Sequence, residues 1–269
     1  MLRAAGQIYR FRSLLGTLTA RELKARYRGS VLGFVWSLAN PLLLLAVYTF
    51  VFTVVFKPRV AGADPYALFV VSGLFPWIWL ATSTLEGANA LSANAGLIRK
   101  AVFPAELLPM VVVLANLIHL LLALIVAGVA IAVAALAGRL PLEHPAAVLL
   151  VPLVILFELP LVAGIALGAS ALTVHFRDLR DLLANAMTLL FFLTPVLYPL
   201  ASLDRFRHLQ LLVRANPFTP FTLAYQEALF YGRVPGPLLW LHMAVVGLIA
   251  WMAGAALFER LRETLVEAA

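Results

Sequence analysis

The sequence of 269 residues contains no cysteine and few charged residues, which make up 12% of the chain. Without cysteine, disulfide frameworks, thiolate metal sites and cysteine nucleophiles are excluded. Soluble globular proteins contain about 25% charged residues, whereas this chain is 63% hydrophobic. A water-soluble globule of this size could not cover so many apolar side chains, but a bilayer solvates them. The composition therefore predicts an integral membrane protein.

Two motifs of nucleotide and metal sites are also missing. None of the 16 glycines is followed by lysine, so the chain lacks the phosphate-binding loop G-x-x-x-x-G-K-[ST]. The zinc motif H-E-x-x-H is absent, and the five histidines are scattered. We therefore expect this chain to be neither an ATPase nor a cofactor-binding protein.

Six uncharged stretches are long enough to cross a membrane. They are residues 29–56, 65–85, 107–138, 145–174, 182–203 and 234–258, interrupted only by Glu158. The third stretch would extend about 48 Å as a helix against a hydrocarbon core of about 30 Å, so it must tilt or project beyond the membrane.

A shorter uncharged segment, residues 215–226, lies between the fifth and sixth stretches. It is too short to span a membrane and contains Pro217 and Pro220, which interrupt helices. We expect a re-entrant or interfacial hairpin there, at the outer face, so the number of spans stays even. The predicted fold is an all-α membrane protein with six transmembrane helices.

The basic residues are distributed unevenly over the two sides that six spans define. Thirteen of the 20 lysines and arginines fall on the side of the two termini. Cytoplasmic segments carry such an excess, so we expect both termini in the cytoplasm. The same rule accounts for the net charge of +7 without a nucleic acid partner. We expect one transmembrane domain over residues 1–269, with an interface helix in 1–30, the spans in 31–260 and a cytoplasmic tail in 261–269.

The segment before the first span predicts an amphipathic helix. Apolar and then basic residues recur at spacings of three and four: Ile8, Phe11, Leu15, Leu18, Arg21, Lys24 and Arg28. Such a helix can lie at the headgroups of the cytoplasmic leaflet, with membrane lipids as its partners. A cleavable signal peptide is disfavoured, because the only apolar piece, residues 14–20, is interrupted by a glycine and two threonines.

Several longer motifs resemble those of one transporter family. They are residues 21–33 (RELKARYRGSVLG), 40–42 (NPL), 47–52 (VYTFVF), 97–104 (LIRKAVFP), 176–179 (FRDL), 194–199 (TPVLYP) and 216–220 (NPFTP). In this order they resemble the permease subunits of type-2 ABC exporters for lipid-linked polysaccharides, of the O-antigen and teichoic-acid kind. The resemblance covers nearly the whole chain. It implies a homodimeric channel in a bacterial inner membrane, two copies of a cytosolic ABC ATPase that bind ATP and Mg, and a polyprenyl-linked glycan as substrate.

The segment between the second and third spans, residues 94–106, combines a basic pair with apolar residues and a proline, which disfavours helical geometry in the residue before it. In the family resembled, this loop contacts the ATPase and the basic helix before the first span lies beside it. The expected ATPase-coupling residues are Asn94, Leu97, Arg99, Lys100, Phe103 and Pro104. The expected interface-helix residues are Arg21, Glu22, Lys24, Arg26, Tyr27 and Arg28. Simple anchoring of these basic residues at the membrane surface stays open as the alternative.

Aromatic residues gather near the ends of the predicted spans. A belt at the membrane interface explains many of them, but others can line a conduit, because a ring stacks on the apolar face of a sugar without demanding a particular hydroxyl pattern. The candidate lumen residues are Trp36, Tyr48, Phe52, Trp77, Glu158 and Tyr198. Glu158 is included because an ionisable residue at bilayer depth is a functional candidate, with a hydrogen bond inside the bundle as the alternative.

Two other functions stay open. Asp178 and Asp181 lie three residues apart and could hold Mg²⁺ or a diphosphate, as in an intramembrane enzyme that acts on a lipid phosphate. Such transferases need further carboxylates and a following glycine and arginine, which this segment lacks, so a turn with local ion pairs is favoured. The second alternative is the same permease architecture with another amphipathic substrate, such as a drug or a lipid.

Overall fold

The computed structural model describes residues 2–56, 62–98, 103–140, 142–176 and 178–268, and only the backbone of residues 2–4, 97–98 and 263–268. Across these ranges all regular structure is helical, and no strand occurs. The predicted all-α class is therefore confirmed.

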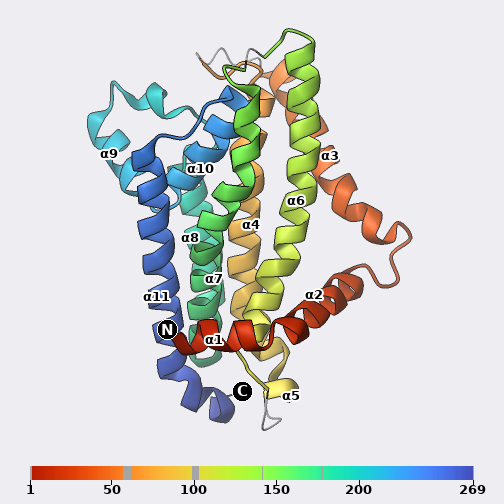
Figure 1. Ribbon diagram of the computed structural model, residues 1–269, viewed down its shortest axis with the longest axis vertical. Coiled ribbons are helices and arrows are strands. Elements are labelled where there is room, and N and C mark those ends of the chain that lie inside the picture. Colours follow the sequence, from red (N-terminus) through yellow and green to blue (C-terminus); the bar gives the residue numbers. More distant parts are fainter. Residues whose placement is uncertain (1, 57–61, 99–102, 141, 177, 269) are drawn as a thin grey trace.

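Three short helices lie at one end of the molecule, together with both termini (Figure 1). They are α1 (Leu2–Arg10), α2 (Arg12–Arg26) and α5 (Ala95–Ile98). The chain breaks its helix at Phe11, so the predicted amphipathic helix consists of two pieces. Figure 1 shows α1 crossing the end of the bundle at a steep angle to the long helices.

Five helical segments of the described chain are long and apolar enough to cross a membrane. The elements that form them are η1 (Gly33–Val35) with α3 (Trp36–Phe50) and the π-helix η2 (Val51–Val55), α4 (Tyr66–Ala93), α6 (Leu107–Leu136), η3 (Pro145–Leu150) with α7 (Val151–His175), and α11 (Pro237–Ala268). They correspond to predicted stretches one, two, three, four and six. Helix α6 rises above α11 at the upper end (Figure 1). Its 30 residues extend about 45 Å at about 1.5 Å per residue, which exceeds the hydrocarbon core of about 30 Å, as expected.

The fifth predicted stretch, residues 182–203, forms a shorter helix than expected. Helix α8 (Leu179–Leu193) has 15 residues and ends at Thr194, whose backbone is extended. Pro195 follows, and the residue before a proline disfavours helical geometry. The chain continues through η4 (Leu200–Leu203), α9 (Arg207–Ala215), α10 (Thr219–Tyr225) and the π-helix η5 (Gln226–Tyr231) at the end opposite the termini.

The closest helix pair, α7 and α11, is joined through glycines. A Cβ atom on Gly254 would lie 1.9 Å from the carbonyl oxygen of Gly164, and one on Gly164 would lie 2.3 Å from that of Ala250. Gly164 and Gly168, like Ala250 and Gly254, are four residues apart and share a helix face. Small residues at this spacing let two membrane helices approach closely, so backbone packs on backbone here.

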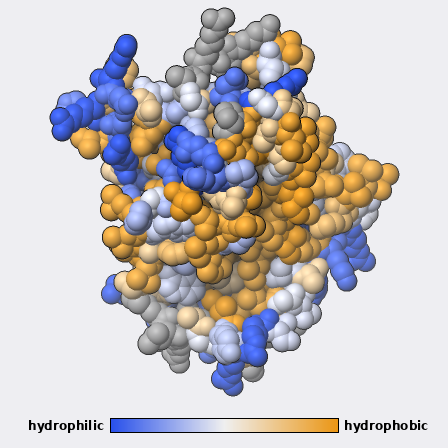
Figure 2. Space-filling model, turned by 45° about the horizontal axis from the view of Figure 1, so that its top comes forward, coloured by the Kyte–Doolittle hydropathy of each residue, from blue (hydrophilic) through white to orange (hydrophobic). Residues whose placement is uncertain are grey.

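Helix α4 lies at the centre of the bundle, where it packs against α6 and α7. Most of its side chains are buried, whereas in α3 only Ser37 and Pro41 are. Figure 2 shows hydrophobic side chains over most of the middle of one face, with hydrophilic ones gathered toward its margins. Such a surface suits a bilayer, which solvates the apolar belt between two polar ends.

Candidate functional site

Four polar residues join the end of α2 to the spanning helices, and we call them the Arg26 cluster: Glu22, Arg26, Glu86 and Asn116. The guanidinium of Arg26 donates hydrogen bonds to Glu86 Oε2 at 2.6 Å and to Asn116 Oδ1 at 2.7 Å. It also bonds to Glu22 at 3.3 Å, one turn earlier in α2. The amide of Asn116 donates to Glu86 at 2.9 Å. Hydrogen bonds to charged groups are the strong ones, so this cluster fixes α2 against α4 and α6.

The next residue after α2 makes a second contact with α6. The hydroxyl of Tyr27 lies 2.6 Å from His119 Nε2, and its ring packs edge-on against Phe34 at 5.6 Å. Arg21, Lys24 and Arg28 are exposed. Of the six predicted interface-helix residues, Arg26 and Tyr27 therefore bind the bundle and Glu22 pairs with Arg26. The other three leave their charges available to headgroups or to a partner.

The predicted coupling segment begins where α4 ends. Asn94 follows α4 and donates from its side-chain amide to the Ala90 carbonyl at 2.9 Å. Leu97 lies in α5, Phe103 is half-buried and Pro104 is buried. The predicted residues Arg99 and Lys100 lie outside the described residues.

A cavity of about 570 Å³ separates the coupling segment from α2. Arg21 and Glu22 line it from α2, Asn94 and Gly96 from the coupling segment, and Val111 from α6. The structure therefore brings the two sequence-predicted groups together at one end of the bundle, although they lie about 70 residues apart in the chain.

The same end is held by an ion pair that the sequence analysis missed. Glu106, at 1% exposure, binds Arg262 of α11 at 3.2 Å. The pair connects the last residue of the coupling segment, directly before α6, to α11.

The candidate lumen residues fall into two groups. Tyr48 and Phe52 are half-buried on α3 and η2, and their rings stack at 5.6 Å. The Phe52 ring meets Tyr66 edge-on at 4.6 Å, and the Tyr66 hydroxyl donates to the Leu197 carbonyl. Tyr198 is half-buried. This first group, with Trp36 at 37% exposure, is accessible from outside the protomer.

The second group is packed inside the helix bundle. Trp77 is 7% exposed and lies between the rings of Phe191 and Phe218 at 5.8 and 5.7 Å. Glu158 is 2% exposed and accepts a hydrogen bond of 2.8 Å from the Tyr225 hydroxyl. The bundle hydrogen bond considered for Glu158 therefore exists, and it ties α7 to the end of α10.

The segment after α8 is held by further polar contacts at the opposite end. Asn216 donates to Thr194 Oγ1 at 2.9 Å and accepts from the Phe218 backbone at 3.0 Å. Gln226 donates to the Pro195 carbonyl at 2.8 Å. The motifs TPVLYP and NPFTP thus bind each other, and α10 with η5 packs against α4.

The acidic pair after α7 is exposed. Asp178 and Asp181 lie at the surface near the start of α8. Within the ranges that the structure describes, no group of three or more potential metal ligands occurs.

Comparison with known proteins agrees with the resemblance seen in the motifs. The family profile described as ABC-2 type transporter matches residues 13–230. The chain belongs to the ABC-2 transporter family. The prediction of a type-2 ABC permease is thereby confirmed.

Curated relatives of this family align over nearly the whole chain. One is the "O-antigen export system permease protein RfbA" of Myxococcus xanthus, 38% identical over 99% of both chains. Two proteins of Klebsiella pneumoniae with the same name are 30% and 29% identical over 94% of both chains.

Sequence reasoning about the family motifs missed the partners that fix them. Asn116 and His119 are polar residues three apart in the long apolar run 107–138, and this spacing was the available signal for a polar face on α6. Tyr225 carries no such signal, because only the folded chain brings it to Glu158.

Proposed function

We propose that this ABC-2 permease forms the membrane channel of an ATP-driven exporter that moves a polyprenyl-linked, O-antigen-like polysaccharide across a bacterial inner membrane. The observation that carries the proposal is the 38% identity over the full chain to an O-antigen export permease. Four of the motifs that carry the resemblance, residues 21–33, 47–52, 194–199 and 216–220, also form contacts described above. ATP hydrolysis belongs to a separate ABC ATPase, which supplies the nucleotide and Mg sites.

In the proposed topology α8 completes a sixth crossing. Its 15 residues extend about 22 Å at about 1.5 Å per residue, less than a hydrocarbon core of about 30 Å. The irregular segment 194–199 and the packed α10 and η5 provide the remaining depth, as a hairpin that re-enters from the outer face. Backbone without regular helix is tolerated at membrane depth where protein buries it, and α10 is largely buried.

Six crossings place both termini, α2 and the coupling segment on one side. Figure 1 supports this arrangement, because α1, α2, α5 and both termini share one end of the bundle. The excess of basic residues on that side assigns it to the cytoplasm.

The proposed channel is a homodimer with the lumen between two copies. Helix α3 exposes Val47 and Phe50, and α8 exposes Leu189 and Phe192, each at more than half of its surface. Lipid can cover these apolar faces as well as a second subunit can, so the faces alone do not require a dimer. The argument for a dimer comes from the substrate. A polysaccharide is polar and wide, and two identical subunits facing each other enclose a lumen that one compact bundle lacks. Tyr48, accessible at this side, is the leading candidate to contact sugar.

The coupling proposal assigns ATPase contact to the coupling segment and the exposed charges of α2. The Arg99→Glu/Lys100→Glu variant should insert into the membrane and keep its fold, yet lose ATPase binding and surface polysaccharide. Arg205→Glu/Arg207→Glu, on the opposite side, is the matched control and should export normally. Copurification of the ATPase and gel analysis of surface glycan measure both effects.

Two results test the coupling assignment and the substrate assignment separately. Normal export by the well-expressed Arg99→Glu/Lys100→Glu variant would refute the coupling assignment. If deletion of the whole chain leaves surface polysaccharide unchanged and no lipid-linked glycan accumulates inside the cell, the substrate assignment is wrong, and another amphipathic cargo must be sought.

The lumen proposal is tested with Tyr48→Ala, and Val133→Ala, at an exposed apolar residue of α6, serves as the control. Loss of a stacking ring should slow export at constant expression, whereas the control should not. Equal export rates in the two variants would place Tyr48 outside the substrate path.

A further inference from the structure

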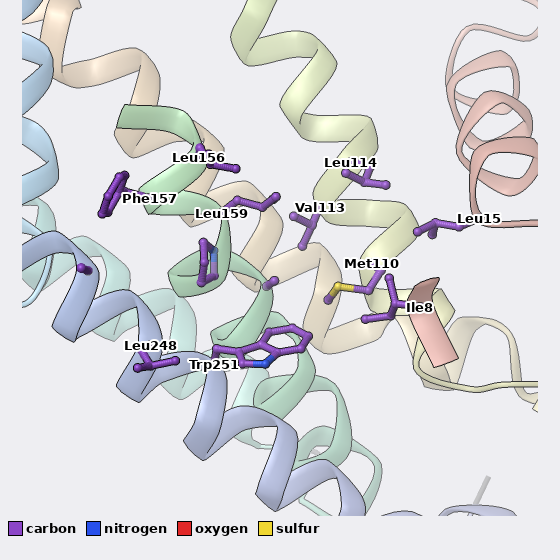
Figure 3. A pocket seen from close by; sticks show the side chains of 13 residues that line it. Ile8, Leu15, Met110, Val113, Leu114, Leu156, Phe157, Leu159, Leu248 and Trp251 are labelled. Carbon is purple, nitrogen blue, oxygen red and sulfur yellow. The ribbon is translucent and has the colours of Figure 1, made fainter. Parts of the chain in front are cut away.

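An apolar groove of about 660 Å³ opens on the outside of the bundle, and none of the aromatic residues of the proposed lumen lines it. Its walls come from α6, α7 and α11, represented by Met110, Phe157 and Trp251 (Figure 3). Figure 3 shows Trp251 and Leu248 on one side and Met110 on the other. All residues that line it have apolar side chains, so it offers a ligand almost no hydrogen-bonding partner.

One end of the groove is closed by α1 and α2. Ile8 of α1 and Leu15 of α2 point toward Met110 at this end (Figure 3). Helix α1 crosses the end of the bundle where both termini lie (Figure 1). Since the long helices run along the membrane normal, α1 lies at the depth of the lipid headgroups, and the groove leads from there into the hydrocarbon core.

The chain segment that forms α1 and the start of α2 is basic. Residues 1–21 include four arginines and no aspartate or glutamate. Two of them, Arg10 and Arg12, stand between Ile8 and Leu15 in the chain, and both are exposed. The guanidinium of Arg12 stacks over the Tyr9 ring at 4.8 Å and bonds to the Tyr9 carbonyl at 3.3 Å, which fixes its position at the junction of α1 and α2.

We propose that this groove binds one acyl chain of an anionic phospholipid, whose phosphate is bound by Arg12 and Arg10. The arginines at the closed end favour an anionic group at the depth of the headgroups. The apolar walls favour a hydrocarbon chain attached to that group. Along α11 the lining runs from Trp251 to Ala244, about 10 Å at about 1.5 Å per residue, which accommodates the first half of a lipid tail. A phospholipid of the cytoplasmic leaflet meets both requirements in one molecule.

The bound lipid would hold the start of the interface helix on the bundle. Its chain fills the space between α1 and α11, and its phosphate neutralises arginines that otherwise repel one another. The membrane composition would thereby stabilise the position of α2, whose far end is fixed by the Arg26 cluster. This inference depends on the membrane location of the chain and not on its substrate.

Trp251 provides a direct probe of the site. The full-length protein is reconstituted into phosphatidylcholine bilayers that contain increasing fractions of phosphatidylglycerol with brominated acyl chains, which quench tryptophan on contact. The difference between wild type and Trp251→Phe isolates the quenching of Trp251 from that of the other four tryptophans. Brominated phosphatidylcholine in phosphatidylglycerol bilayers gives the reverse titration.

We expect phosphatidylglycerol to be preferred over phosphatidylcholine by about fivefold or more, since one basic side chain near an anionic surface contributes about 1 kcal/mol. Arg10→Gln/Arg12→Gln should lower the preference to about one. In wild type, added salt should weaken it, because screening reduces exposed charge interactions. Ala244→Phe should fill the groove and abolish Trp251 quenching, whereas Val245→Phe, an exposed neighbour outside the groove, should leave it unchanged.

Three results would overturn the proposal. Equal quenching of wild type and Trp251→Phe would show that no acyl chain enters the groove. Equal affinity for the two phospholipids, with no dependence on salt, would show that the arginines do not bind the headgroup. Displacement of brominated phosphatidylglycerol by a smaller fraction of polyprenyl phosphate would assign the groove to the carrier lipid instead.

Discussion

Replacing Gly254 by alanine tests the backbone contact between α7 and α11. The new Cβ atom would lie 1.9 Å from the Gly164 carbonyl oxygen and 2.9 Å from its Cα atom, whereas real Cβ contacts below 3.0 Å essentially do not occur. The two helices must therefore separate locally by about 1 Å. The obstacle is backbone, which has no alternative rotamer to adopt.

The expected cost follows from two opposing effects. Overpacking of a well-packed interior costs about 1–3 kcal/mol, and we expect the upper end because a gap of 1 Å also forfeits about a quarter to a half of the dispersion energy of neighbouring contacts. Alanine favours a helix over glycine by about 1 kcal/mol. Gly254→Ala should therefore destabilise the protein by about 2 kcal/mol.

Gly128 provides a matched control within another spanning helix. A Cβ atom there meets nothing within 4 Å, so Gly128→Ala should be neutral or stabilising by up to about 1 kcal/mol. Unfolding in mixed micelles with increasing denaturing detergent, followed by circular dichroism, compares the two variants with wild type. Gly164→Ala, on the facing helix, should behave like Gly254→Ala. The reasoning is refuted if Gly254→Ala and Gly128→Ala unfold at the same midpoint.

Three further changes test the polar contacts. Arg26→Gln should speed hydrogen exchange in α2, because each hydrogen bond to a charged group stabilises by about 1.5–3 kcal/mol; unchanged exchange would show that the Arg26 cluster does not hold α2. Tyr225→Phe should lower the free energy of unfolding by about 1–3 kcal/mol, since Glu158 loses its buried donor, and an unfolding midpoint equal to that of wild type would contradict this. The hydrogen bond from Arg233 lowers the pKa of the Glu143 carboxyl. The resulting stability is complete above the ordinary pKa of 4.5 and is lost as pH falls below it, so Arg233→Gln should flatten this acid dependence of the unfolding midpoint.

The predicted spans were most accurate for the two longest of the six uncharged stretches. Stretch three, residues 107–138, matches α6, and stretch four, residues 145–174, matches η3 with α7. A membrane span is specified mainly by its own hydrophobicity and length, which are local properties of the sequence. The prediction for residues 182–203 was too long, because Pro195 ends α8 before the uncharged run ends.

The sequence by itself determined the membrane class, the positions of most spans and the family, because composition, charge runs and motifs are local or ordered along the chain. The residues assigned to ATPase coupling and to the interface helix stay predictions from the sequence. Only the tertiary structure decided which of these side chains bind one another. Arg26 reaches Glu86 and Asn116, and Tyr225 reaches Glu158, across separations of 60 or more residues. The contact of Gly164 with Gly254 likewise depends on how two helices cross. Such contacts are set by packing between distant segments, for which a single sequence carries no local signal.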